Sequence, residues 1–140
     1  MTYGLAAEVS TGLVFVSDSR TNAGVDRVLT YSKMHQIGIA GERQFVILSA
    51  GNIATTQSVI SSLRNDIEVG APGNFLSTMG MEDAADYLGA VVRAETERHT
   101  EAVAAPGFNA ETTLIFGGQI AGRPTGLFLI YPQGNHIAAS

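Results

Sequence analysis

The chain has 140 residues, a length that suits one domain, and its 45% hydrophobic and 15% charged residues exclude a disordered protein. The net charge is −5 and the eight Lys and Arg residues are scattered, which argues against a nucleic-acid-binding surface. The absence of cysteine excludes disulfides, thiolate nucleophiles and cysteine metal sites. The sequence shows neither a long apolar run nor a secretory signal at its start, so we expect a cytoplasmic protein that does not enter the membrane.

The first part of the chain predicts two pairs of β-strands. Alternating apolar residues over 3–9, followed by an apolar run over 13–16, predict a β-hairpin. The polar stretch 17–27 predicts a loop. A second pair is predicted at about 34–40 and 44–50, joined by a turn that contains Gly41.

Two helices follow. A largely apolar stripe recurs at spacings of three and four, formed by Ile53, Thr56, Ile60, Leu63 and Ile67. Asn52 is in place as an N-cap, and a Gly-Pro-rich stop follows residue 69. A second helix is predicted over about 81–101. Its first turn carries Glu82 and Asp83, which interact favourably with the helix dipole.

Strands return at the end of the chain, near 112–119 and 125–131, and another begins after residue 135. We interpret Gly117, Gly118 and Gly122 as a hairpin turn, because no Gly-Lys-Ser/Thr phosphate loop accompanies them. Hairpins on both sides of a helix pair predict an α+β fold with antiparallel sheets and the helices packed on one face. The last strand begins without an obvious partner, so we expect that the chain is a C-terminally incomplete unit that would not fold cooperatively alone.

Four residues have chemistry worth weighing together. Removal of Met1 would leave Thr2 with a hydroxyl nucleophile and an α-amine, whose ordinary pKa of about 7.7 to 8.0 suits a base. Asp18 follows an apolar strand and is placed to orient a cation, while Lys33 would hold a nearby amine neutral by repulsion. Gly51 lies at a strand-to-helix junction, where its N–H is placed to stabilise an oxyanion. Each has an ordinary alternative: a common Met-Thr start, a surface Asp, a strand-end Lys and a tight turn.

Taken in register, these residues resemble the proteasome β-subunit family, and most closely the bacterial ancestral β-subunit, Anbu. The similarity rests on Thr2 and on the segments 12–20, 22–24, 33–35 and 49–57, and it extends through the turn at 131–135. The resemblance implies the four-layer αββα sandwich of N-terminal-nucleophile hydrolases, with residues 1–140 forming one β-subunit domain that lacks its C-terminal strands and helices.

The resemblance also assigns roles to particular residues. It implies that Thr2 is the nucleophile, that Asp18 and Lys33 are the charged pair beside it, and that Gly51 supplies the oxyanion-hole N–H. Three further residues match substrate-binding positions: Thr21 and Asn22, which would hold the substrate backbone extended, and Ser49, which would shape the first specificity pocket.

The function that the resemblance implies is hydrolysis of peptide amides by a threonine peptidase. Two alternatives remain open: a proteasome-like scaffold that self-assembles without turnover, and an acylase of the same fold acting on small amides. We expect a homo-oligomer, as a ring or an open spiral, that takes peptides or unfolded proteins; an unfoldase partner cannot be named. No cofactor is implied, and the three histidines lack the spacing of a metal site.

Overall fold

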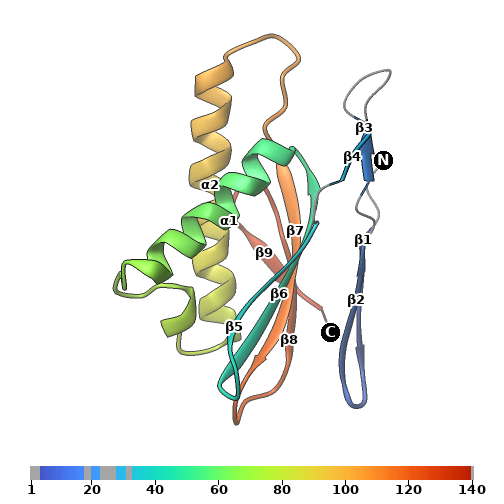
Figure 1. The fold of residues 1–140 in the computed structure, drawn as a ribbon, viewed down its shortest axis with the longest axis vertical. Helices are drawn as coiled ribbons and strands as arrows, with labels where there is room; N and C mark the ends of the chain where they lie inside the picture. The colour runs from blue at the N-terminus through green and yellow to red at the C-terminus, as the bar shows by residue number, and fades with distance from the viewer. Residues whose placement is uncertain (1–3, 18–19, 23–27, 31–32, 140) are drawn as a thin grey trace.

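The computed structural model describes residues 4–17, 20–22, 28–30 and 33–139. Its centre is an antiparallel sheet with the strand order β5-β6-β7-β8-β9. Helices lie on one face of this sheet and a β-hairpin lies on the other (Figure 1). This arrangement confirms the α+β class. The strands of the sheet are β5 (Met34–Ile39), β6 (Arg43–Gly51), β7 (Thr112–Ile120), β8 (Gly126–Ile130) and β9 (His136–Ala138).

The predicted N-terminal hairpin is present as β1 (Gly4–Val9) and β2 (Gly12–Ser17). It lies against the sheet through Phe15, and a Cβ added at Gly117 would fall 2.7 Å from the Phe15 ring. A Cβ at Gly118 would fall 2.1 Å from the Gln44 carbonyl oxygen. Both glycines lie inside β7, as the strand predicted near 112–119 requires, and they let the hairpin and β6 approach closely. Their interpretation as part of a hairpin turn was wrong, and only Gly122 belongs to the turn.

The loop predicted over 17–27 contains a strand. The short strands β3 (Arg20–Asn22) and β4 (Val28–Thr30) pair with each other in an antiparallel two-stranded ribbon. Three residues are too few to show a period of two, and the polar composition of this stretch favoured a loop. These residues form strands because β3 and β4 pair with each other, and no local sequence pattern predicts that pairing.

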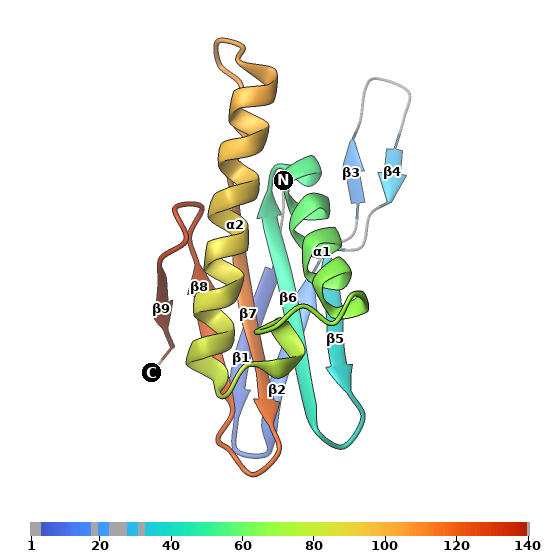
Figure 2. The same cartoon turned by 90° about the vertical axis from the view of Figure 1, so that its left-hand side faces the viewer.

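Both predicted helices are confirmed. Helix α1 (Ile53–Glu68) begins at Asn52, whose side-chain oxygen accepts a hydrogen bond from the Thr55 N–H at 3.0 Å. Helix α2 (Met81–Val103) ends two residues later than predicted, and its C-cap Ala104 has the left-handed conformation with φ 46°. Figure 2 shows both helices crossing the same face of the sheet. Neither helix in the described part of the chain is long and apolar enough to span a bilayer.

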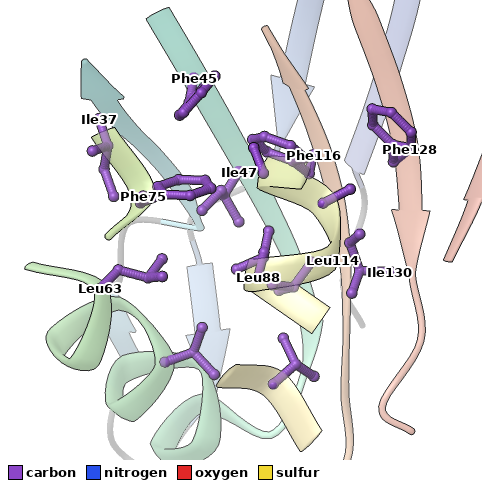
Figure 3. Packing of buried hydrophobic residues seen from close by; sticks show 14 of the residues in the cluster. Ile37, Phe45, Ile47, Leu63, Phe75, Leu88, Leu114, Phe116, Phe128 and Ile130 are labelled. Atoms are coloured by element: carbon purple, nitrogen blue, oxygen red, sulfur yellow. The ribbon is translucent and has the colours of Figure 1, made fainter. Parts of the chain in front are cut away.

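The core lies between the helices and the sheet, where aromatic rings from distant segments meet. Phe75, in the short 3₁₀ helix η1 (Phe75–Ser77), is 4.6 Å from Phe45 and 5.4 Å from Phe116 between ring centroids. Figure 3 shows these side chains gathered between the two layers. Tyr87 adds a polar link, because its hydroxyl donates to the Asp66 carboxylate of α1 at 2.5 Å. The segment between the helices is therefore part of the core rather than a simple linker.

The outer face of the hairpin is apolar and exposed. Leu5, Val14 and Val16 are each about half exposed, at 50%, 51% and 48%. Among the described residues no helix covers this face. Three layers of the expected αββα sandwich are thus seen in the described ranges: helices, the five-stranded sheet and the hairpin.

Arg43 joins the start of β6 to the segment between the helices. Its side chain is largely buried, and Nη1 donates to the Thr78 carbonyl at 3.0 Å and the Thr78 hydroxyl at 3.2 Å. The other side of the guanidinium makes two bonds to the Glu42 carboxylate, at 2.7 and 2.8 Å. The residue that the sequence suggested as part of a turn is therefore an anchor for the helical layer.

We expect Arg43→Met to lower the free energy of unfolding of the full-length protein by about 2 to 3 kcal/mol, because buried acceptors lose a charged donor. Arg93→Met is the matched control. The Arg93–Glu97 pair is exposed on α2, with Nε–Oε1 at 3.2 Å, so its loss should change stability by less than about 0.5 kcal/mol. Urea unfolding of both variants measures the difference, and equal effects would contradict the anchoring role.

Candidate functional site

Part of the predicted site falls outside the described residues. Thr2 and Asp18 lie there, so their roles as nucleophile and charged partner stay predictions. Thr21 and Asn22 lie in β3, where their backbones pair with Leu29 and Val28. An extended backbone at these positions is the form needed to bind a substrate strand, although no substrate contact follows from it alone.

Lys33, Ser49 and Gly51 lie at the same end of the five-stranded sheet. The Ser49 N–H donates to the Lys33 carbonyl at 3.0 Å, which continues the β5–β6 pairing by one residue beyond Met34. Lys33 is only 6% exposed. A buried lysine at a strand end is unusual, since most lysines keep their ammonium in water, and it is the environment that the proposed electrostatic role requires.

The direction of the Gly51 N–H follows from its neighbours. The Ala50 carbonyl faces β7, because the Thr112 hydroxyl lies 3.3 Å from it. In a trans peptide the carbonyl and the next N–H point in opposite directions, so the Gly51 N–H points away from β7. The Ser49 N–H, two residues earlier on the same strand, points toward β5. The Gly51 N–H therefore points to the side of β5, beyond the backbone of Lys33.

Gly51 cannot be replaced without strain. Its φ is 130°, and a Cβ there would lie 2.5 Å from the Glu111 carbonyl oxygen and 2.9 Å from the Thr112 Cα. The next N–H, that of Asn52, donates to the same Glu111 carbonyl at 2.9 Å. Packing against β7 thus explains why a glycine stands here, and it also fixes the peptide whose N–H the sequence analysis proposed as an oxyanion donor.

Asn52 ties the start of α1 to the loop before β7. Its side-chain oxygen caps the helix, while its amide nitrogen donates to the Asn109 carbonyl at 3.1 Å. The N-cap of helix α1 is therefore the residue directly after Gly51, and the partly positive N-terminal end of the helix lies beside the candidate donor. This end of the helix favours negative charge near the strand end.

Two residues of this junction were missed by the sequence analysis. The hydroxyls of Thr56 on α1 and Thr112 on β7 lie 2.7 Å apart, and both side chains are buried. The Thr56 hydroxyl also lies 2.9 Å from the Asn52 carbonyl. Thr56 stood in the predicted apolar stripe of α1, and a threonine at a buried stripe position is the one signal that could have pointed to a polar partner.

His35 lies on β5, two residues beyond Lys33, opposite Ile47. Its Nε2 is buried and has no hydrogen-bond partner. Burial lowers the pKa of His35, and the nearby Arg64 guanidinium lowers that pKa further. The ring is therefore neutral near pH 7. Within the described ranges, no group of His, Asp and Glu side chains is arranged to hold a metal ion.

The chain is similar to solved structures of Anbu proteins over nearly its whole length. It matches "Anbu (ancestral beta-subunit) from Yersinia bercovieri" with 43% identity and a TM-score of 0.87, covering 98% of this chain and 56% of that one. It matches the "Helical Assembly of the Anbu Complex from Pseudomonas aeruginosa" with 38% identity and a TM-score of 0.89, covering 100% and 57%. It also matches an Anbu (Gly-1) mutant from Hyphomicrobium sp. strain MC1 with 39% identity and a TM-score of 0.85, covering 100% of this chain and 56% of that one. The chain thus spans a little over half the length of these proteins. No protein-family model and no curated protein matches it.

Proposed function

Since the chain belongs to the Anbu family of proteasome-like N-terminal-nucleophile hydrolases, we propose that it provides the nucleophile and the oxyanion donor of a threonine peptidase. The observation that supports the proposal most directly is that buried Lys33 pairs through its carbonyl with the Ser49 N–H, on the strand that ends at the tightly packed Gly51. The similarity of the chain to Anbu proteins supports Thr2 as their partner in this proposal.

In the proposed mechanism, loss of Met1 frees the α-amine of Thr2. The amine takes the hydroxyl proton, directly or through water, while the oxygen attacks an amide carbonyl. Lys33, paired with Asp18, keeps the amine neutral by charge repulsion, and the Gly51 N–H stabilises the oxyanion that forms. The leaving amine takes a proton, and water then hydrolyses the acyl ester on Thr2. Thr21 and Asn22 hold the substrate backbone, and Ser49 lines the first specificity pocket.

Intact-mass measurement of the purified full-length protein tests this proposal first. We expect the mass of the chain without Met1, and a single added mass after treatment with a peptide electrophile directed at an N-terminal threonine. Peptide mapping should place that adduct on Thr2. A retained Met1 would block the amine and contradict the peptidase, because a capped Thr2 has no base. The Thr2→Ala protein is the control and should take no adduct.

Two alternative functions predict different behaviour of Met1 and Thr2. An acylase would use Thr2 in the same way but act on small acyl amides, so it would be inactive on short peptides. A non-catalytic scaffold would keep Met1 and still assemble. Self-association is part of the proposal under either reading, since one of the similar structures is a helical assembly of Anbu. The proposal also includes a cytoplasmic location and peptides or unfolded proteins as substrates.

A further inference from the structure

Two buried hydroxyls link the carbonyl of Ala50, the residue before Gly51, to the carbonyl of Asn52, the residue after it. Thr112 Oγ1 is 3.3 Å from the Ala50 carbonyl, which precedes Gly51, and Thr56 Oγ1 is 2.9 Å from the Asn52 carbonyl, which follows it. The two hydroxyl oxygens are 2.7 Å apart. Thr56 and Thr112 are 6% and 1% exposed, so bulk water does not compete for these contacts.

The two hydroxyls have fewer protons than the contacts require. Each threonine hydroxyl donates one hydrogen bond, but three contacts lie within hydrogen-bond distance. In one arrangement Thr112 donates to Thr56 and Thr56 donates to the Asn52 carbonyl. In the other, Thr56 donates to Thr112 and Thr112 donates to the Ala50 carbonyl. The distances of 2.9 and 3.3 Å favour the first arrangement in the resting protein.

The second arrangement becomes more favourable when the Gly51 N–H binds an anion. The Ala50 carbonyl and the Gly51 N–H belong to the same planar peptide group, whose electrons are delocalised. When the Gly51 N–H donates to a negative oxygen, negative charge builds up on the Ala50 carbonyl oxygen of the same peptide. The Ala50 carbonyl therefore becomes a stronger hydrogen-bond acceptor. Hydrogen bonds in such chains strengthen one another, and the effect is larger in a buried site.

We propose that Thr112 and Thr56 are positioning residues that tighten their hold on the Ala50–Gly51 peptide as an oxyanion forms. The Thr112 hydroxyl turns from Thr56 to the Ala50 carbonyl, and the Thr56 hydroxyl turns from the Asn52 carbonyl to Thr112. Each proton stays on its own oxygen, so no covalent bond changes. The contribution is made in the transition state rather than in the bound substrate, and it rests on the proposed function of Gly51 as oxyanion donor.

The experiment compares Thr112→Val with Thr112→Ser in the full-length protein. Valine keeps the shape of threonine without the hydroxyl, and serine keeps the hydroxyl. We expect Thr112→Val to lower kcat for a peptide amide by roughly 3- to 10-fold, the effect of one neutral hydrogen bond, with KM little changed. A peptide aldehyde, whose adduct with Thr2 places an oxygen at the oxyanion position, should lose affinity by a similar factor. Thr112→Ser should restore most of both losses.

Thr55→Val is the matched control. Thr55 is fully buried on the same helical turn as Thr56, but its hydroxyl has no hydrogen-bond partner. Its replacement should leave kcat and aldehyde affinity unchanged. If Thr112→Val lowers only the unfolding midpoint and leaves kcat and aldehyde affinity at the wild-type values, the proposed reorientation of the two hydroxyls is wrong. The threonine pair is then merely structural. If the wild-type protein shows neither turnover nor an aldehyde adduct, the proposed function is contradicted, and with it the proposed role of the two hydroxyls.

Discussion

Thr2→Ala should reduce turnover of a peptide amide by the full-length protein at least about 10³-fold, because loss of a hydrolase nucleophile removes the whole covalent route. Thr2→Ser should keep a measurable part of the activity, since both the hydroxyl and the α-amine survive. Steady-state kinetics on a fluorogenic peptide amide measures both variants against the wild type.

Two further variants help to interpret a loss of activity in Thr2→Ala. Lys33→Ala should also disable the chemistry while leaving assembly intact, since the proposed role of Lys33 is electrostatic. Thr100→Ala is a control on the exposed end of α2, where the hydroxyl bonds only to the Thr96 carbonyl within its own helix. Wild-type hydrolysis by Thr2→Ala would exclude Thr2 as the nucleophile, and the scaffold alternative would not account for that activity either.

Gly89→Ala should destabilise the protein by about 2 to 3 kcal/mol, the cost of overpacking a site that cannot relax. Gly89 lies in the middle of α2, and a Cβ there would fall 2.1 Å from the Gly134 carbonyl oxygen, in the turn between β8 and β9. Gly134 has φ 94° and in turn lies against the Gly89 carbonyl. Both sides of the contact are backbone, so neither can rotate away.

The sign of the Gly89 effect is what makes the test informative. In an ordinary exposed helix, replacing glycine by alanine stabilises by about 1 kcal/mol. Ala90→Gly, at the next and exposed position of α2, is the control and should cost about that amount from helix propensity alone. Thermal and urea unfolding of the full-length protein give both values. Stabilisation by Gly89→Ala would show that α2 does not approach the β8–β9 turn this closely.

The elements that the sequence predicted well are those whose pattern is local. The apolar spacing of α1 and α2, and the Asn52 cap, depend on residues within one or two turns, and both helices form where expected. The two hairpins were equally accessible, because a run of alternating or apolar residues on each side of a turn limits the register.

What the sequence could not predict are contacts between distant segments. Arg43 was expected in a turn, yet its partner Thr78 lies 35 residues away. Gly117 was predicted within a strand but interpreted as part of a hairpin turn, while the contact that its lack of a side chain permits is with the ring of Phe15 on another sheet. In the candidate site, Lys33, Ser49 and Gly51 could be proposed from resemblance. The support that Thr56 and Thr112 give them depends on how α1 packs on β7.

The neighbouring strands β6 and β7 have a consequence for how the protein is made. The Thr112 hydroxyl and the Ala50 carbonyl, which lie 3.3 Å apart, are 62 residues apart in the sequence, and both helices lie within the loop between them. Closing a long loop costs chain entropy before any contact is gained, and such non-local pairings slow folding. During synthesis, the peptide at Gly51 therefore leaves the ribosome well before β7 exists to hold it. Under the proposed function, a nascent chain would carry Thr2 long before the Gly51 peptide is held in place, so hydrolysis would begin only when the sheet closes.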